Sequence, residues 1–238
     1  MKMLLFTLYE KLLAAYGPQG WWPLPSRAGR KGFDAQGYHP GDYSWPRTVP
    51  EKFEIIVGAI LTQNTAWTNV EMALQRLRAE GITRPADLAV CPTSRLRRMI
   101  RSSGYFNQKA KKLKVAAEAF LSPASLSMSR APTREDLLGL WGIGRETADS
   151  ILLYVFQKPF FVVDAYTRRL LERLGTVGPG MAYDDLQAVF HAGLPRSHEL
   201  YNEMHALIVE HAKRHCRTKP LCAGCPVARF CAWRGKNA

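Results

Sequence analysis

The sequence lacks any long apolar run. No stretch of 18 or more consecutive apolar residues occurs among its 238 residues, which argues against a membrane-spanning helix. The first residues, MKMLLFTLYEKLLAAYG, begin like a secretory signal, but Glu10 and Lys11 interrupt the apolar run and no small-residue cleavage site follows. We therefore expect an amphipathic first helix in a cytoplasmic protein that has no membrane partner.

Acidic residues are few compared with basic ones. The chain has 20 Asp and Glu against 33 Lys and Arg, a formal net charge of +13. Such a charge attracts polyanions, so nucleic acid is the favoured partner. Some basic side chains are expected to lie on solvated helix faces only. Those around Gly104 and Tyr105 are candidates for a DNA-facing surface: Arg97, Arg98, Arg101, Lys109, Lys111 and Lys112.

The alternating pattern of β-strands is also missing. Apolar residues recur at spacings of three and four from residue 51 onward, which predicts an all-α protein. Residues 23–50 are instead rich in glycine and proline and predict a long irregular loop. The predicted helices cover residues 2–16, 51–63, 67–80, 93–102, 108–121, 133–140, 145–157, 165–174, 183–192 and 197–214.

Cysteine is scarce except at the C-terminal end. Four of the five cysteines form the pattern Cys216-x5-Cys222-x2-Cys225-x5-Cys231. Disulfides fit poorly with a chain that has no export signal, so metal ligation is the better interpretation. Zinc more often uses two separated Cys-x2-Cys pairs, whereas one compact loop of four thiolates can hold a [4Fe–4S] cluster. We favour the cluster, with zinc as the alternative.

Two motifs precede the cysteines. Gly142-Ile143-Gly144 follows an apolar helix end and leads into a helix that opens near Arg145. Glycines at a helix start can turn backbone N–H groups toward a phosphate, although such a turn can also be only a tight connection. Asp164 then ends the apolar run PFFVV. An aspartate at this point is either a functional carboxylate or a simple N-cap.

The combination of glycine hairpin, aspartate after an apolar run and four-cysteine loop resembles the helix-hairpin-helix DNA glycosylases of the endonuclease III superfamily. The resemblance spans roughly residues 48–231, with five instead of the usual six residues between the first two cysteines. It implies two helical lobes on either side of a DNA-facing cleft. Residues 48–158 would form the lobe with the hairpin, and residues 1–47 plus 159–238 the lobe with the cluster loop, 216–231.

The resemblance also implies roles for single residues. Asp164 matches the catalytic aspartate, which stabilises the cationic sugar as the base leaves. Gln63, in ILTQNT, matches a glutamine that fills the gap left by the extruded nucleotide, and its alternative role is that of a polar helix-end residue. The hairpin residues that would hold a DNA phosphate are Leu140, Gly142, Gly144 and Arg145.

Glu146 stands where bifunctional members of the family carry a lysine that attacks the sugar. A carboxylate cannot form the imine of that reaction, so the resemblance implies release of a base without strand cleavage. Glu146 can also be a structural acid in the first turn of a helix, where it opposes the positive end of the dipole.

The substrate class follows from a narrower resemblance. GPQGWWP, together with GIGRETAD and VVDAY, is similar to the 3-methyladenine glycosylases of the superfamily. Trp21, Trp22 and Pro23 would then line a pocket for a cationic alkylated purine, because aromatic faces attract cations; packing is their other possible role. The chain ends seven residues after Cys231, so we do not expect the added recognition domain of the adenine glycosylases.

We therefore expect a monofunctional glycosylase that acts as a monomer, associated with the nucleoid, on double-stranded DNA with a damaged base. One alternative is an endonuclease III-like glycosylase and lyase for oxidised pyrimidines, with another lysine as nucleophile. A second alternative is a non-catalytic DNA-binding iron–sulfur protein.

Overall fold

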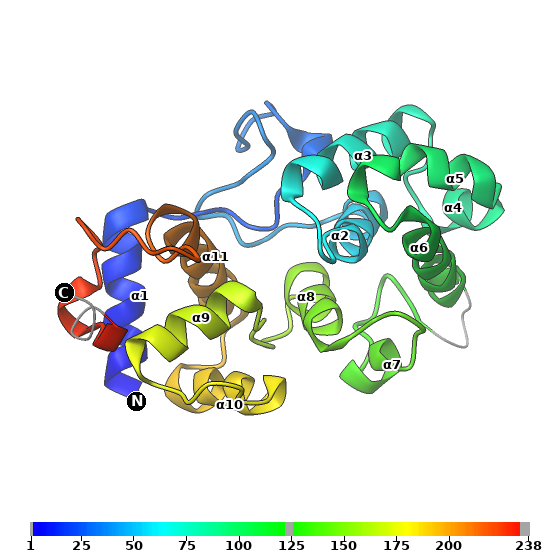
Figure 1. Ribbon diagram of the computed structural model, residues 1–238. Helices are drawn as coiled ribbons and strands as arrows, with labels where there is room; N and C mark the ends of the chain where they lie inside the picture. The colour runs from blue at the N-terminus through cyan, green and yellow to red at the C-terminus, as the bar shows by residue number, and fades with distance from the viewer. Residues whose placement is uncertain (1, 122–125, 234–238) are drawn as a thin grey trace. The chain divides into compact units, whose positions relative to one another are not determined.

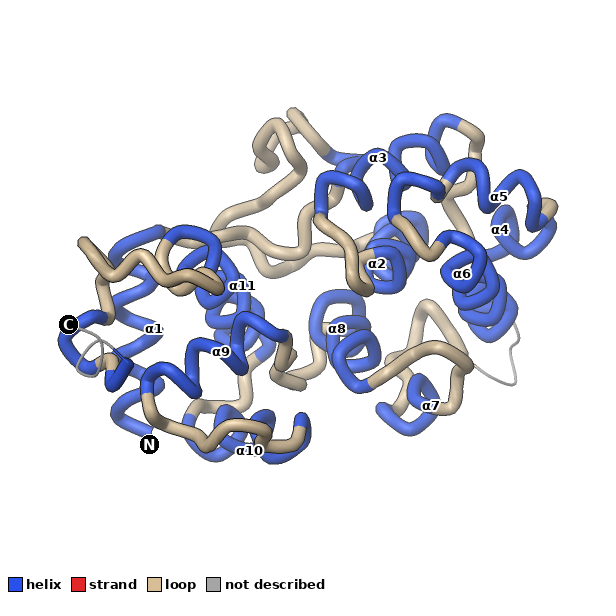
Figure 2. The backbone as a smooth tube through the Cα atoms, viewed as in Figure 1, coloured by secondary structure: helices blue, strands red, loops and turns tan. Residues whose placement is uncertain are grey.

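The computed structural model describes residues 2–121 and 126–233, and every regular element in these ranges is helical (Figures 1 and 2). The predicted all-α class is therefore confirmed. Contacts between Cα atoms divide the chain into two units. Unit 1 combines residues 1–21 with 159–238, and unit 2 is the continuous segment 22–158.

Unit 1 is built around one buried helix. This helix is α11 (His198–Arg214), in which all nine residues from Tyr201 to Val209 are buried. A helix that is buried on all sides needs partners around it, and the first helix supplies one with Leu5, Leu8 and Leu12. The helices of unit 1 are α1 (Lys2–Tyr16), α9 (Ala165–Leu174), α10 (Tyr183–Gly193), α11 (His198–Arg214) and the 3-10 turn η3 (Ala228–Phe230).

Unit 2 also has a central helix. In α2 every residue from Ile55 to Leu61 is buried, and α2 packs against α3, α6 and α8. The elements of unit 2 are η1 (Pro25–Arg27), α2 (Val49–Leu61), α3 (Trp67–Ala79), α4 (Pro85–Val90), α5 (Thr93–Met99), η2 (Arg101–Ser103), α6 (Phe106–Leu121), α7 (Arg134–Leu138) and α8 (Arg145–Phe156).

Local signals in the sequence explain where several helices begin and end. Thr133 accepts from the Asp136 N–H at 3.1 Å while the Asp136 carboxylate accepts from the Thr133 N–H at 2.8 Å, which is a complete capping box before α7. Gly175 closes α9 in the left-handed conformation. The sequence analysis missed α4, a six-residue helix that is too short to show a clear apolar period.

Residues 22–47 differ from the prediction. The lobe boundaries inferred from the family place them with the C-terminal part of the chain, but the structure assigns them to unit 2. Glu54 of α2 accepts from the Ser26 N–H at 2.9 Å, and the buried Glu51 forms an ion pair with Arg27 and accepts from the Arg47 N–H. These contacts hold the segment against α2. The contact partners Ser26 and Glu54 are 28 residues apart, so patterns of neighbouring residues could not predict them.

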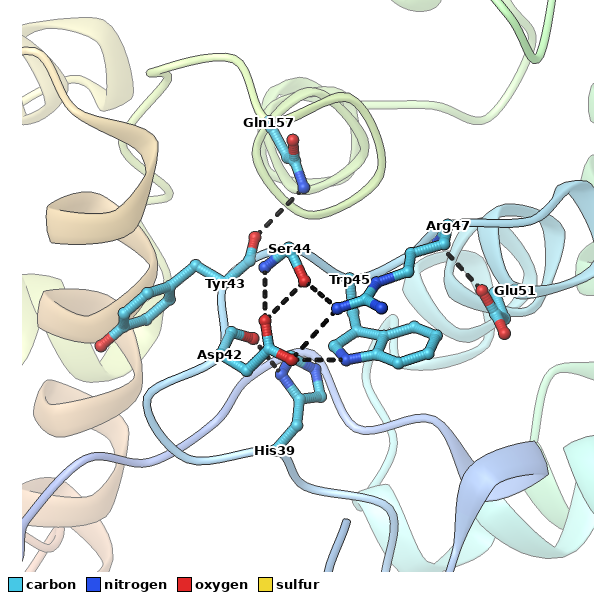
Figure 3. Close-up of polar contacts among 8 residues, drawn as sticks. All are labelled: His39, Asp42, Tyr43, Ser44, Trp45, Arg47, Glu51 and Gln157. Atoms are coloured by element: carbon cyan, nitrogen blue, oxygen red, sulfur yellow. Dashed lines mark hydrogen bonds and ion pairs between the residues drawn. The ribbon is translucent and has the colours of Figure 1, made fainter. Parts of the chain in front are cut away.

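The end of this segment has its own polar network (Figure 3). The Asp42 carboxylate accepts from the Ser44 N–H at 3.0 Å and from the Trp45 indole N–H at 2.9 Å. Gln157, which follows α8, donates to the Tyr43 carbonyl at 3.1 Å. Residues 22–47 thus form an ordered segment of unit 2, here called the strap. Side-chain hydrogen bonds near both of its ends hold it to the helices of that unit.

Candidate active site

Asp164 lies at the start of α9, at the end of a buried apolar segment. Phe161, Val162 and Val163 are each at most 3% exposed, and they bring the chain out of the core of unit 1. The Asp164 carboxylate accepts from the Thr167 N–H at 2.7 Å, so the residue is an N-cap. Its side chain is 14% exposed. The capping bond uses Oδ1, and the second carboxylate oxygen points to another partner.

That partner is His205, which the sequence analysis missed. Its Nε2 lies 3.5 Å from Asp164 Oδ2, and the ring is 4% exposed on α11. The only signal in the sequence is a polar residue four positions after Tyr201 on an otherwise apolar helix face. A histidine in that position is usually a packed core residue, so sequence alone gives no reason to select it.

These contacts set the charge of the carboxylate. Burial alone would raise the pKa of Asp164, but the hydrogen bond and charge of His205 and the Thr167 N–H outweigh it, so the pKa lies below its ordinary value. Asp164 is therefore ionised at neutral pH. Unit 1 thus holds a fixed negative charge in a site with little access to water.

Trp21 and Trp22 have different environments although they are adjacent in sequence. Trp21 is half-buried in unit 1, with its ring edge-on to His205 at 5.5 Å between centroids and 88° between planes. Trp22 is 7% exposed in unit 2, and its ring packs against Trp67 and Tyr154. Trp22 is therefore packed in the core of unit 2, and its place in a base pocket stays a prediction.

Pro23 shares the environment of Trp22. It is buried in unit 2, and its predicted pocket role likewise stays a prediction. Of the three predicted pocket residues, Trp21 is the one whose ring packs against His205, the partner of Asp164. Its carbonyl accepts from the Asn202 side chain of α11 at 2.8 Å, which fixes the backbone at this point.

The glycine hairpin lies in unit 2 between α7 and α8. Its turn is closed by the Ile143 N–H, which donates to the Leu140 carbonyl at 3.1 Å, and buried Ile143 anchors it to the core. Gly142 has φ +85°, a conformation that L-residues rarely adopt. Gly144, the N-cap of α8, has no side chain to cap the helix, and it is exposed. The hairpin can therefore bring backbone N–H groups to an anion.

Arg145 and Glu146 form the exposed first turn of α8. Arg145 adds a cation at the place where an anion would bind. Glu146 occupies the second helical position, which is also where an acidic side chain is favourable for the helix dipole. The roles of Arg145 in phosphate binding and of Glu146 in place of the lysine stay predictions.

Gln63 lies close to the same hairpin. Its side-chain amide donates to the Gly142 carbonyl at 3.2 Å and to Thr147 Oγ1 at 2.9 Å, and its carbonyl oxygen accepts from Lys112. The predicted helix ends at Leu61 instead of residue 63, so Gln63 is in the turn that follows. The structure thus joins two predicted DNA-contacting elements of unit 2.

The predicted basic surface needs one correction. Arg97, Arg98, Arg101 and Lys111 are exposed, whereas Lys109 is 2% exposed. The Lys109 ammonium donates to the Leu61 carbonyl at 2.8 Å and to the Ser103 carbonyl at 2.6 Å. Burial, with some repulsion from Lys112, lowers its pKa to about 8. Lys109 therefore holds the end of α2 and does not face a ligand.

The four C-terminal cysteines form a separate part of unit 1. All are free thiols, with Cys216 buried and Cys222, Cys225 and Cys231 partly exposed. Within residues 2–121 and 126–233, no three His, Cys, Asp or Glu side chains are arranged to hold a single metal ion. The pKa of Cys225 is raised by burial and by the charges of Cys231, Cys222 and Cys216. The four thiols are thus close enough for their charges to act on one another.

Arginines of α9 fasten the cysteine loop, residues 216–231. Arg169 donates to the Cys216 carbonyl at 2.8 Å. Arg173 donates to the Cys216 sulfur at 3.4 Å and to the Thr218 carbonyl at 2.9 Å. Since Asp164 is the N-cap of α9, this one helix has the candidate catalytic carboxylate at its N-terminus and supports the cysteine loop from its last turns.

Comparison with known proteins agrees with this arrangement. The model of the HhH-GPD superfamily of base excision DNA repair proteins matches residues 57–196. A protein of Methanocaldococcus jannaschii named "Putative DNA repair glycosylase" is 38% identical over 235 residues, 96% of each chain. Endonuclease III of Thermotoga maritima is 30% identical over 200 residues, which are 81% of this chain and 91% of that protein.

Solved structures give the same result. The H. pylori 3-methyladenine DNA glycosylase MagIII, bound to 1,N6-ethenoadenine, has a TM-score of 0.67 and 30% identity over 90% of this chain and 97% of that one. An endonuclease III in a non-covalent DNA complex has a TM-score of 0.77 at 20% identity over 100% and 98% of the two chains, which shows the shared fold. None of the helices that the structure describes is long and apolar enough to span a bilayer. The chain belongs to the HhH-GPD superfamily of base excision DNA repair proteins.

Proposed function

We propose that this protein is a monofunctional DNA glycosylase that hydrolyses the N-glycosidic bond of alkylated purines, such as 3-methyladenine, in double-stranded DNA, and that it acts as a monomer in the cytoplasm at the nucleoid. The observation that carries the proposal is Asp164, ionised and nearly buried beside His205, whose ring packs against Trp21. A negative charge held in a site of low polarity stabilises a developing positive charge far better than it would in water.

The chemistry needs little more than this charge. As the bond between the sugar and the base breaks, both electrons leave with the base, and the sugar becomes cationic. A purine that is already positively charged departs as a neutral molecule and needs no proton from the enzyme. Asp164 stabilises the cationic sugar until the oxygen of a water molecule bonds to the anomeric carbon, and the proton lost by that water passes to the carboxylate or to solvent.

His205 and Trp21 are assigned supporting roles. His205 keeps Asp164 ionised, which makes it a positioning residue and not a catalytic one. The ring of Trp21 lies edge-on to His205 and is half-buried, so it can offer an aromatic face to a cationic base. Such a contact contributes about 0.5–2 kcal/mol and favours alkylated over normal purines.

Glu146 supports the monofunctional assignment. A lyase reaction begins when an amine forms an imine with the sugar, and a carboxylate cannot do so. We therefore propose that the reaction stops at the abasic site. The hairpin, Arg145 and Gln63 are assigned to DNA binding, in unit 2, because the hairpin residues and Arg145 are positioned at a helix start and Gln63 is bonded to the hairpin.

We further propose that Cys216, Cys222, Cys225 and Cys231 hold a [4Fe–4S] cluster. Such a cluster, when bound, supplies four metal–thiolate bonds that fix the loop, which has few apolar side chains of its own. Val227 is the one fully buried apolar side chain between Cys216 and Cys231. Arg173 then contributes a donor to the Cys216 thiolate.

The test uses duplexes that contain either 3-methyladenine or thymine glycol, each divided into alkali-treated and untreated halves. We expect strand cleavage only at 3-methyladenine and only after alkali. Direct nicking at thymine glycol, with a product trapped by borohydride, would instead establish the endonuclease III-like alternative, which the Thermotoga maritima relative supports. Binding without release of either base would establish the non-catalytic alternative.

A further inference from the structure

Both ends of the Gln63 side chain are occupied in the free protein. The amide nitrogen donates to Gly142 and Thr147 in the hairpin region, and the carbonyl oxygen accepts from Lys112. An ammonium group can only donate, so Lys112 fixes which end of the amide faces the hairpin. A glutamine that is to enter a DNA duplex must first give up these three bonds.

Lys112 also touches the hairpin itself. A Cβ atom on Gly142 would lie 2.6–2.8 Å from three carbon atoms of the Lys112 side chain. The aliphatic part of Lys112 therefore runs along the hairpin glycine before its ammonium reaches Gln63. One side chain of α6 thus contacts both the element assigned to phosphate binding and the residue assigned to the duplex gap.

We propose that Lys112 is a positioning residue that holds Gln63 against the hairpin in free protein and exchanges it for a DNA phosphate when the hairpin binds the strand. The inference rests on the proposed function, because it takes the DNA-binding roles of the hairpin and Gln63 from there. It adds a residue and an order of events: the phosphate arrives first, and Gln63 is then released to the gap.

Charge favours this exchange. A hydrogen bond from an ammonium group to a phosphate oxygen joins two ions, and such bonds are roughly twice as strong as bonds between neutral groups. Lys112 also repels the buried ammonium of Lys109, which lowers the pKa of that group. A phosphate beside Lys112 offsets this repulsion, whereas the neutral amide of Gln63 does not.

The first experiment measures binding to an undamaged duplex at several salt concentrations. Lys112→Met keeps the aliphatic contact with Gly142 and removes the ammonium. We expect the slope of log K against log salt to become shallower by about 0.9, the value for one lost phosphate contact. Lys114→Met is the matched control from the same helix, since Lys114 donates to the carbonyls of Leu88 and Ala89. An unchanged slope in Lys112→Met would overturn the exchange.

The second experiment tests the hold on Gln63 with a duplex that contains a stable abasic-site analogue. Gln63→Ala removes a contact with the gap in both backgrounds, but only in the wild type does it also remove the Lys112 bond that opposes release. We therefore expect Gln63→Ala to weaken binding about threefold more in the Lys112→Met background than in the wild type. Equal losses in the two backgrounds would show that Lys112 does not hold Gln63 back.

The outcome is separable from that of the proposed function. Both experiments measure binding and need no base release, so a protein without glycosylase activity can still pass them. If the protein releases the base but Lys112→Met leaves the salt slope unchanged and Gln63→Ala weakens binding equally in both backgrounds, the proposed function stands and this inference fails. Thermal unfolding of each variant confirms that the measured protein is folded.

Discussion

The surroundings of Asp164 in unit 1 and the hairpin of unit 2 differ in how exposed their candidate functional groups are. Asp164 is 14% exposed, accepts from the Thr167 N–H and lies 3.5 Å from His205 Nε2. The hairpin presents Gly144, Arg145 and Glu146 to solvent and relies on backbone groups. A charge that acts on a transition state gains from a dry, fixed site, whereas groups that meet a DNA strand must be accessible before it arrives.

The largest expected effect is the loss of base release when the nearly buried Asp164 loses its charge. Asp164→Asn keeps an oxygen that can accept from the Thr167 N–H, so α9 remains capped. It removes the negative charge, and we expect base release to fall by about 10³-fold, the size of effect found when electrostatic stabilisation is lost. Duplex binding, measured by fluorescence anisotropy, should stay within about threefold of wild type. Unchanged base release would exclude Asp164 as the catalytic residue.

A second prediction separates the two tryptophans. Trp22→Ala removes a ring packed against Trp67 and Tyr154, and we expect the free energy of unfolding to fall by about 3–5 kcal/mol. Trp21→Ala should cost much less stability, because Trp21 is only half-buried, and should instead weaken release of the alkylated base. Denaturant unfolding and single-turnover rates measure the two effects. Equal stability losses would show that both tryptophans are packing residues.

A third prediction compares the two hairpin glycines. Gly142→Ala places a Cβ within 2.8 Å of the Lys112 side chain at φ +85°, and we expect it to destabilise the protein by about 1–3 kcal/mol and to weaken DNA binding. Gly144→Ala is the control for folding, because it has φ −94° and nothing lies within 4 Å of the added atom. Thermal unfolding of the two variants gives the difference. A Gly144→Ala loss as large as that of Gly142→Ala would refute this account of the turn.

The smallest expected effect is a change in pH dependence. Because the pKa of Asp164 is lowered, its ionised form stabilises the folded protein above the unfolded pKa, and this contribution is lost as the pH falls through the folded pKa. We expect His205→Gln to raise the pKa of Asp164 and move the acidic limb of the rate–pH profile to higher pH, with a modest loss of rate at neutral pH. An unmoved limb would mean that His205 does not set the charge of Asp164.

Features that depend only on residues close together in the sequence could be predicted from it. The helical periods, the Thr133 capping box, the glycine hairpin and the position of Asp164 at a helix start all follow from patterns within a few residues, and all are present in the structure. The family resemblance extended these local patterns and is confirmed by the comparisons. Helix caps and apolar spacings involve residues only three or four positions apart, so they can be recognised in the sequence.

The remaining features required the folded chain, because they depend on contacts between residues far apart in sequence. Trp21 meets His205, 184 residues later by number (205 − 21), while its neighbour Trp22 enters the core of unit 2. Gln63 meets Gly142 across 79 positions, and Lys109 meets Leu61 across 48. By itself the sequence determined the longer helices, the hairpin turn and the place of Asp164 before a helix. Only the tertiary structure decided which of two adjacent tryptophans packs against His205 and which lysine is buried, since burial depends on what packs over a side chain and not on its neighbours in the chain.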